Sequence, residues 1–355
     1  MDRESFKSDY HRHIRMKVVF ILVCIVISVV AMGFELSAGS FKIGFFEAFE
    51  IIYNHITGNI PTDYSGATKD DIVCRMYLPR AIAGLAVGAG FGICGAAMQS
   101  SLKNPLADPY TTGISAGASF GASLAIVLGF SVLSGVMGHA AIVINAFIFA
   151  MIPGVAIVAI SHLKKSITPA AMILVGIAIM YIFTASTTFL KLTASEDSLA
   201  EVYKWSIGTL GKASWDNVWF MVAAFVFGII MIQSAATKLN VLSMNDKGSI
   251  ALGVDPKKVR VRMIAVVSIV TSFMVSFTGT IGFVGLVAPH VARLFIGSDN
   301  KYLIPASAMV GAVILLVSDV IAKSVGTGLP VGVVTAIVGG PLFIWLLIRQ
   351  QKNAW

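Results

Sequence analysis

Few side chains in this sequence have a type and spacing that could support metal or thiol chemistry. The histidines His55, His139 and His162 are isolated, and none has the spacing of a metal-ligand pair. There are three cysteines, an odd number, and two of them lie inside apolar blocks, so no disulfide framework can be assembled. The cysteines are Cys24, Cys74 and Cys94. We therefore predict no metal site, no bound cofactor and no enzymatic activity.

A phosphate-binding loop is also missing. Direct ATP hydrolysis needs the pattern G-x-x-x-x-G-K-[ST], and the single Gly-Lys pair, Gly211-Lys212, has Ser206 and Ala213 where that pattern requires glycine and Ser or Thr. If the chain pumps a solute, ATP and Mg²⁺ must be used by a separate subunit.

Charged residues inside apolar segments would indicate ion coupling, and Asp319 is the clearest candidate. Lys323 follows four residues later on the same helical face. A local ion pair between these two side chains would explain both without a proton relay.

The composition indicates a membrane protein. Of the 355 residues, 57% are hydrophobic and 12% are charged, which is about half the charged fraction of a soluble domain. The formal net charge of +8 would also suit a nucleic-acid binder. Here, however, the basic residues flank apolar blocks, so we expect contact with membrane lipid and not with nucleic acid.

The elements that carry these residues are predicted to be membrane-spanning helices, each of which needs about 20 residues. Eight uncharged blocks are long enough to be considered, and glycines divide two of them, near Gly135 and Gly138 and at Gly279 and Gly282. The blocks are Val18–Phe34, Ala81–Leu102, Pro109–Leu163, Ser166–Leu190, Asn217–Thr237, Met263–Ala292, Tyr302–Ser318 and Ser324–Ile348. The sequence thus predicts an all-α polytopic membrane protein with ten transmembrane helices.

The distribution of basic residues predicts the orientation. With the N terminus inside, cytoplasmic segments hold 18 of the 26 Lys and Arg residues and external segments hold 8. We therefore expect a cytoplasmic tail at 1–17, a ten-helix transmembrane domain at 18–350 with a cytoplasmic loop at 237–262, and a cytoplasmic tail at 351–355. The first apolar block exceeds a usual signal-peptide core, so we expect it to be retained as a span.

The cytoplasmic loop has the signals of a short capped helix. Asn245 can cap its start, Gly253 can take the left-handed conformation that ends it, and Asp255 followed by Pro256 begins the next helix. One interpretation is a helix that only touches lipid headgroups. Its small apolar face, Ile250, Ala251 and Leu252, suits a groove in a partner protein better.

A second loop, between the second and third spans, must turn tightly. Pro105 and Pro109 push Asn104 and Asp108 out of the helical region, so a rigid helical hairpin is predicted. Glycines also recur at four-residue intervals on these spans, at Gly84, Gly88, Gly92, Gly113, Gly117 and Gly121. This spacing favours close helix packing; alternatively, Gly88 and Gly117 border a wide substrate path.

Several ordered motifs resemble those of a known family, the FecCD or cobalamin-permease-like membrane subunits of ABC importers for iron-siderophores, haem and cobalamin. The resemblance runs from about Val18 to Gln350. The motifs are Leu78-Pro79-Arg80, Gly95-Ala-Ala-Met-Gln99, Asn104 to Pro109 followed by Gly113-Ile-Ser-Ala-Gly117, Ala251-Leu-Gly-Val254, Gly282 to His290, Leu329 to Thr335 and Gly340-Pro341.

The resemblance implies an ABC importer type II permease fold, in which an inverted repeat relates spans two to five with spans seven to ten. It implies a homodimer, or a heterodimer with a related permease, in the plasma membrane of a prokaryote. Two cytoplasmic ATPases would dock on the inner loop, so that Asn245 to Asp255, including Val254, couple ATP hydrolysis to transport.

An external binding protein would deliver the substrate to basic residues at the outer face. Arg80 matches the family position for such docking, although simple anchoring at the membrane interface is the alternative. The residue before Leu-Pro-Arg, often Arg in the family, is Tyr77 here, and Arg75 lies two residues further back. Lys323 is the second expected docking residue.

The substrate path is expected to have neutral walls. Met98, Gln99, Thr184, Thr187 and Thr188 are the residues we expect to line it, beside Gly88 and Gly117. The expected cargo is a bulky metal chelate, an iron-siderophore in the first instance, with haem and cobalamin as alternatives. An ion-gradient-driven secondary transporter is the competing class, although buried carboxylates near the midplane, which such carriers use, are not evident in the sequence.

Overall fold

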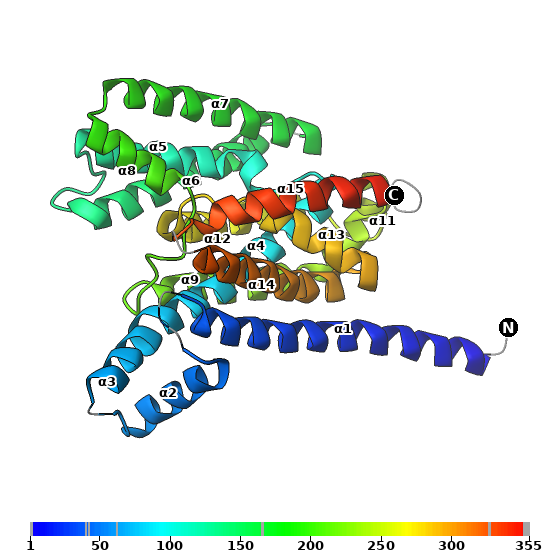
Figure 1. The fold of residues 1–355 in the computed structure, drawn as a ribbon. Coiled ribbons are helices and arrows are strands. Elements are labelled where there is room, and N and C mark those ends of the chain that lie inside the picture. The colour runs from blue at the N-terminus through cyan, green and yellow to red at the C-terminus, as the bar shows by residue number, and fades with distance from the viewer. Residues whose placement is uncertain are drawn as a thin grey trace.

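The computed structural model of the chain describes residues 3–39, 41, 43–61, 63–164, 167–325 and 328–350. Within these residues the fold is entirely helical (Figure 1). The helices are α1 (Arg3–Ser37), α2 (Phe45–Thr57), α3 (Tyr64–Asp71), a π-helical turn (Ile72–Tyr77), α4 (Leu78–Leu102), a 3₁₀ turn (Pro109–Thr112), α5 (Ile114–Leu128), α6 (Gly138–Leu163), α7 (Pro169–Thr193), α8 (Glu196–Ser206), α9 (Val218–Gln233), α10 (Ala236–Leu242), α11 (Asp246–Ala251), α12 (Pro256–Thr278), α13 (Val284–Ile296), α14 (Asn300–Ser324) and α15 (Val331–Gln350).

Apolar helices occupy each of the ten predicted segments, but they differ in length. Among the described residues, six stretches are long and apolar enough to cross a membrane alone, and α9 with α10 forms a seventh that is bent by 54°. Three shorter apolar helices, α5, α13 and α15, complete the set. The number of ten complete crossings and their orientation stay predictions.

Helix α4 forms the centre of the bundle. It packs against α9, α12, α13 and α14, and nearly all of its side chains are buried. Small residues make this possible because they allow the neighbouring backbones to approach closely. α1 lies along α14 on one side, and α5, α6 and α7 pack together on the other.

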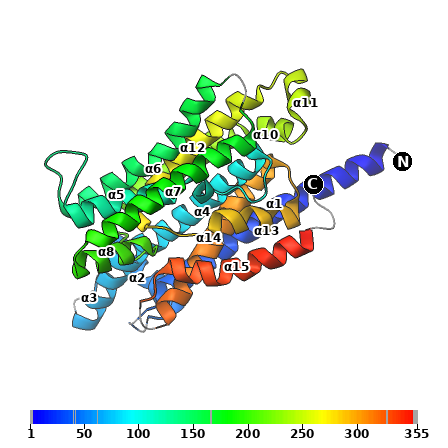
Figure 2. The same cartoon turned by 90° about the horizontal axis from the view of Figure 1, so that it is seen from above.

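The two ends of the bundle carry different elements. Figures 1 and 2 both place α2, α3 and α8 at one end and α11 at the other, so we call these the α3 end and the α11 end. The first residues of α1 and the last residues of α15 also point toward the α11 end (Figure 2). The predicted N-terminal tail is helical from Arg3 onward, continuous with the first apolar block, whereas 351–355 lie outside the described residues.

Candidate functional site

The predicted capped helix is present at the α11 end. The Asn245 side chain accepts a hydrogen bond from the Gly248 amide at 2.6 Å, and Gly253 has a φ of 78°, the left-handed conformation expected after the helix. Asp255 then caps α12 by accepting from the Lys257 and Lys258 amides. These local predictions are confirmed.

This helix presents an apolar surface that the rest of the chain leaves uncovered. Met244, Ile250 and Leu252 are 60%, 64% and 59% exposed, while Ser249 on the opposite face is buried and donates to the Val241 carbonyl. Ala251 and Gly253 are exposed between the large side chains. The result is a small, rigid apolar surface of the kind that fits a groove in a partner.

Three charged side chains tie α11 to the bundle; we call Asp246, Arg260 and Lys103 the α11 clamp. The Asp246 carboxylate accepts from both terminal nitrogens of Arg260, at 2.9 and 2.7 Å, and from the Lys103 ammonium at 3.2 Å. Arg260, which is buried, also donates through Nε to the Ser101 carbonyl at 3.1 Å. The clamp therefore connects α11 directly to the last turn of α4.

The pKa of Asp246 is lowered by its two basic partners. The hydrogen bonds from Arg260 are the largest cause that lowers the pKa of Asp246 to about 2, with Lys103 contributing in the same direction. Because the folded-state pKa lies below the ordinary value of 3.8, the stabilisation is fully present above that pH and is lost as the pH falls toward 2. The sequence analysis did not identify the clamp, because nothing in the sequence distinguishes Arg260 from the other basic residues of this loop as the partner of Asp246.

A cavity of about 430 Å³ lies toward the α3 end between α5, α7 and the α12–α13 connection. Its walls carry hydroxyl groups together with small and apolar residues, and one cation. The lining is Tyr110, Ser115, Ala116, Ser119, Met180, Thr184, Thr187, Thr188, Lys191, Ser206, Thr280 and Gly282. Three of the predicted path residues, Thr184, Thr187 and Thr188, are thus brought together here.

The threonine hydroxyls of this wall are already satisfied within α7. Each donates to the carbonyl four residues earlier: Thr184 to Met180 at 2.8 Å, Thr187 to Phe183 at 2.8 Å and Thr188 to Thr184 at 2.9 Å. A hydroxyl whose proton is used in this way can still accept a hydrogen bond but has no free donor for a passing solute. These three side chains therefore offer hydrogen-bond acceptors but no free hydroxyl donors to the cavity.

The other four predicted path residues lie elsewhere and do not line this cavity. A Cβ at Gly88 would stand 2.5 Å from the Gly311 carbonyl oxygen, and one at Gly117 would stand 2.4 Å from that of Phe149. Met98 and Gln99 are buried, and Gln99 bonds to the Leu286 carbonyl and to Arg293. All four pack helices together and do not line the cavity.

The predicted tight turn after α4 is confirmed and adjoins the cavity, but α5 packs against α6 and α7 and not against α4, so the two helices do not form the expected helical hairpin. Asn104 accepts from the Leu106 amide, and Asp108 caps the 3₁₀ turn by accepting from the Tyr110 amide. Asp108, which precedes Pro109, is extended with a φ of -140° and a ψ of 149°, as expected. The Tyr110 hydroxyl then accepts from the Ile281 amide at 2.8 Å, which links this turn to the α12–α13 connection.

A buried charge cluster lies at the α3 end of the bundle. Arg80 donates to both carboxylate oxygens of Asp319, at 2.8 and 2.7 Å, and Lys323 lies 2.6 Å from Glu35. Both acids are completely buried, and the side chains of Arg80 and Lys323 are 19% and 5% exposed. The predicted Asp319–Lys323 pair is therefore wrong in its partners, and sequence reasoning missed Glu35.

The three expected docking residues differ in their exposure. Arg75 forms an exposed pair with Asp71 at 3.1 Å, and its side chain is 73% accessible. Arg80 and Lys323 are committed to the buried cluster just described, because a buried acid needs a basic partner close by. Of the three, only Arg75 presents its charge fully to solvent.

Comparison with known proteins gives a consistent result. A family model described as the FecCD transport family matches residues 20–349. The chain is 36% identical over 287 residues to the cobalamin import system permease protein of Halobacterium salinarum, covering 81% of this chain and 76% of that one. It is 31% identical to the hemin transport system permease protein of Yersinia pestis, covering 79% and 84%.

A solved structure has the same fold. It is described as an inward-facing conformation of a metal-chelate type ABC transporter, and it superimposes with a TM-score of 0.80 at 25% identity, covering 93% of this chain and 98% of that one.

Proposed function

Because the chain belongs to the FecCD transport family, we propose that it is the membrane-spanning permease subunit of a binding-protein-dependent ABC importer. It moves a bulky metal chelate into the cytoplasm of a prokaryotic cell, and ATP with Mg²⁺ is consumed on separate ATPase subunits. An iron-siderophore is the proposed cargo; cobalamin and haem, the cargoes named for two relatives, are the alternatives.

The observation that carries this proposal is the exposed apolar surface of α11 and its attachment to α4. Two ATPase subunits would dock on Met244 and on Asn245 to Asp255 of the two permeases of a dimer. A movement imposed on α11 would pass through the α11 clamp to α4, the helix that packs against most of the bundle.

The translocation path is proposed to follow the hydroxyl-lined cavity on α5 and α7. We retain Thr184, Thr187 and Thr188 and add Gly282, Ser119 and Lys191 as lining residues. At the outer face, the external binding protein is proposed to dock on Arg75 and the exposed edge of Arg80. Nothing observed for Lys323 supports its docking role.

An ion-driven secondary transporter is the alternative class, and the buried acids Glu35 and Asp319 are the observation that would favour it. Each of these acids, however, lies within salt-bridge distance of a basic side chain at the α3 end of the bundle. A carboxylate fixed in this way is poorly placed to bind and release a coupling ion.

Reconstitution into liposomes separates the two classes. The permease alone should not accumulate an iron chelate under a sodium or pH gradient, and uptake should require the ATPase, the binding protein and ATP together. Gradient-driven accumulation by the permease alone would overturn the proposal.

A further inference from the structure

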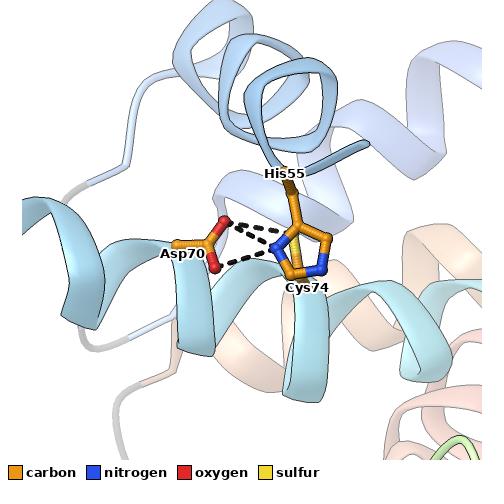
Figure 3. Close-up of side chains that lie close together, drawn as sticks. All are labelled: His55, Asp70 and Cys74. Atoms are coloured by element: carbon orange, nitrogen blue, oxygen red, sulfur yellow. Dashed lines mark hydrogen bonds and ion pairs between the residues drawn. The ribbon is translucent and has the colours of Figure 1, made fainter. Parts of the chain in front are cut away.

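Three potential metal ligands meet at the α3 end, away from the cavity and from α11. His55 comes from α2, Asp70 from the end of α3 and Cys74 from the π-helical turn that follows it (Figure 3). His55 Nδ1 lies 3.0 and 2.9 Å from the two Asp70 oxygens, and the Cys74 sulfur lies 3.7 Å from Asp70 Oδ1. One donor atom from each residue falls within 4.8 Å of the others.

The backbone explains why these groups converge. Asp70 and Cys74 are four residues apart and share one face of the continuous helix from Tyr64 to Leu102. The π-helical turn sits at this point, and such turns are frequent at functional sites. α2 folds back beside α3 and brings His55 onto the same face.

The buried Asp70 carboxylate is not paired with a Lys or Arg side chain among the described residues, so a bound cation could balance its charge. Asp70 is 5% exposed, and among the described residues no Lys or Arg pairs with it. The two nearest cations in sequence are used elsewhere, because Lys69 bonds to Glu47 and Arg75 bonds to Asp71. Its ion-pair partner among the described residues is His55 at 2.9 Å, which carries a charge only when it is protonated. A buried carboxylate is stabilised by a positive partner, and a bound cation would supply that charge while His55 and Cys74 supply a nitrogen and a sulfur ligand.

The spacing fits a small tetrahedral ion. Zinc binds histidine nitrogen and carboxylate oxygen at about 2.0 Å and thiolate at about 2.3 Å, so two such ligands lie about 3.3 to 3.5 Å apart. The observed separations of 2.9 Å for His55 to Asp70 and 3.7 Å for Cys74 to Asp70 bracket this range. The third separation, between His55 and Cys74, is within 4.8 Å, so closure of this edge around the ion would complete three ligands.

We propose that His55, Asp70 and Cys74 form a binding site for one Zn²⁺-like divalent cation, with water as the fourth ligand. Binding breaks the Cys74 S–H bond, and the thiol proton leaves to solvent. It also breaks the His55–Asp70 hydrogen bond; the proton leaves Nδ1 and the neutral ring carries its proton on Nε2 instead, so that Nδ1 can bind the ion. The half-exposed His55 gives the ion access, since its side chain is 40% accessible. The thiolate and the carboxylate together neutralise the 2+ charge and fasten α2 to α3.

Cobalt(II) is the probe that tests this site, because a thiolate ligand gives it a charge-transfer absorption that nitrogen and oxygen ligands do not. The full-length chain, stripped with a chelator in detergent, should bind one Co²⁺ with this absorption, and Zn²⁺ should displace it. Cys74→Ser should abolish the absorption. His55→Ala should weaken Co²⁺ binding by more than about 100-fold, because even outer-shell partners of a metal contribute 10- to 100-fold.

The double variant with Cys24→Ser and Cys94→Ser is the matched control. Both of these thiols are buried in α1 and α4, and the variant should keep the full absorption. His55 is exposed, so the His55→Ala variant should fold and elute normally on size exclusion. If Cys74→Ser fails to fold, the loss of Co²⁺ binding in His55→Ala still tests the site. No thiolate absorption with the wild type, or absorption that persists in Cys74→Ser, would overturn the proposal.

Discussion

At the scale of single residues, the glycines of this chain divide into two kinds. Gly88 and Gly92 bring α4 against α14, and a Cβ at Gly92 would stand 2.0 Å from the Ser307 carbonyl oxygen. Gly282, in contrast, lines the cavity, and a Cβ there would meet no heavy atom within 4 Å. Glycine therefore allows close helix packing at Gly92, whereas at Gly282 it leaves the cavity unfilled.

Leucine substitutions distinguish these two roles. Gly282→Leu should leave the permease folded and assembled but reduce ATP-driven uptake by at least tenfold, because the side chain projects into the cavity. Gly88→Leu should lower the yield of folded protein, since it collides with the Gly311 backbone. Size exclusion measures the yield of folded protein, and an uptake assay measures ATP-driven transport, for each of the two variants. Normal uptake by Gly282→Leu would remove this cavity from the path.

The buried charge cluster makes a second prediction at the residue scale. Asp319→Ala leaves the Arg80 guanidinium without its bidentate partner in a site that is 19% exposed. Breaking a buried pair costs about 3 to 5 kcal/mol, so thermal unfolding in detergent should shift strongly downward. Arg75→Ala, which removes an exposed pair worth about 0.5 kcal/mol, is the control. A melting temperature of Asp319→Ala equal to that of the wild type would show that the charge cluster does not stabilise the fold.

At the scale of elements, the α11 clamp decides whether a movement of α11 reaches the bundle. α11 has six residues and too few internal hydrogen bonds to hold its own position. Its orientation depends on the Asn245 cap, on Ser249 packed over α10 and on the Asp246–Arg260 pair. Removing the pair should loosen α11 while leaving its apolar surface available to an ATPase.

Arg260→Ala should therefore uncouple the importer. The assembled complex should still bind the ATPase and hydrolyse ATP, but uptake per ATP should fall by at least tenfold. Arg262→Ala is the matched control, because Arg262 lies on the same helix and its hydrogen-bond partner in the described part of the chain is the exposed Ser234 hydroxyl at 3.0 Å. The measurement is the ratio of uptake to phosphate release, and an unchanged ratio in Arg260→Ala would exclude the clamp from coupling.

At the scale of the whole molecule, one flank of the bundle exposes large apolar side chains. α7 lies at the edge of the fold in Figure 1, and its outer surface carries exposed Leu174, Tyr181 and Phe189. Thr184 and Thr188 are exposed on the same helix and open into the cavity. A second permease against this flank would enclose the cavity between two subunits.

Cross-linking tests that arrangement. In a chain with all three native cysteines changed to serine, Thr188→Cys should form a disulfide between two copies on mild oxidation if the permease is a homodimer. Val155→Cys, at an exposed position on α6, should not. A purified dimer in which Thr188→Cys stays reduced would place the interface elsewhere.

Much of the local structure followed from the sequence. Apolar blocks determined the helical segments, and Asn245, Gly253 and Asp255–Pro256 determined where α11 and α12 begin and end. These features depend on residues within a few positions of one another, because backbone hydrogen bonds and caps are short-range.

The tertiary structure alone decided which faces meet. Arg80 finds Asp319 across 239 residues, and Lys323 lies against Glu35 rather than against its helical neighbour. His55 and Cys74, with no recognisable ligand spacing in the sequence, converge on Asp70. Helical periodicity assigns residues to a common face, but only the packing of one helix on another determines the partner that the face contacts.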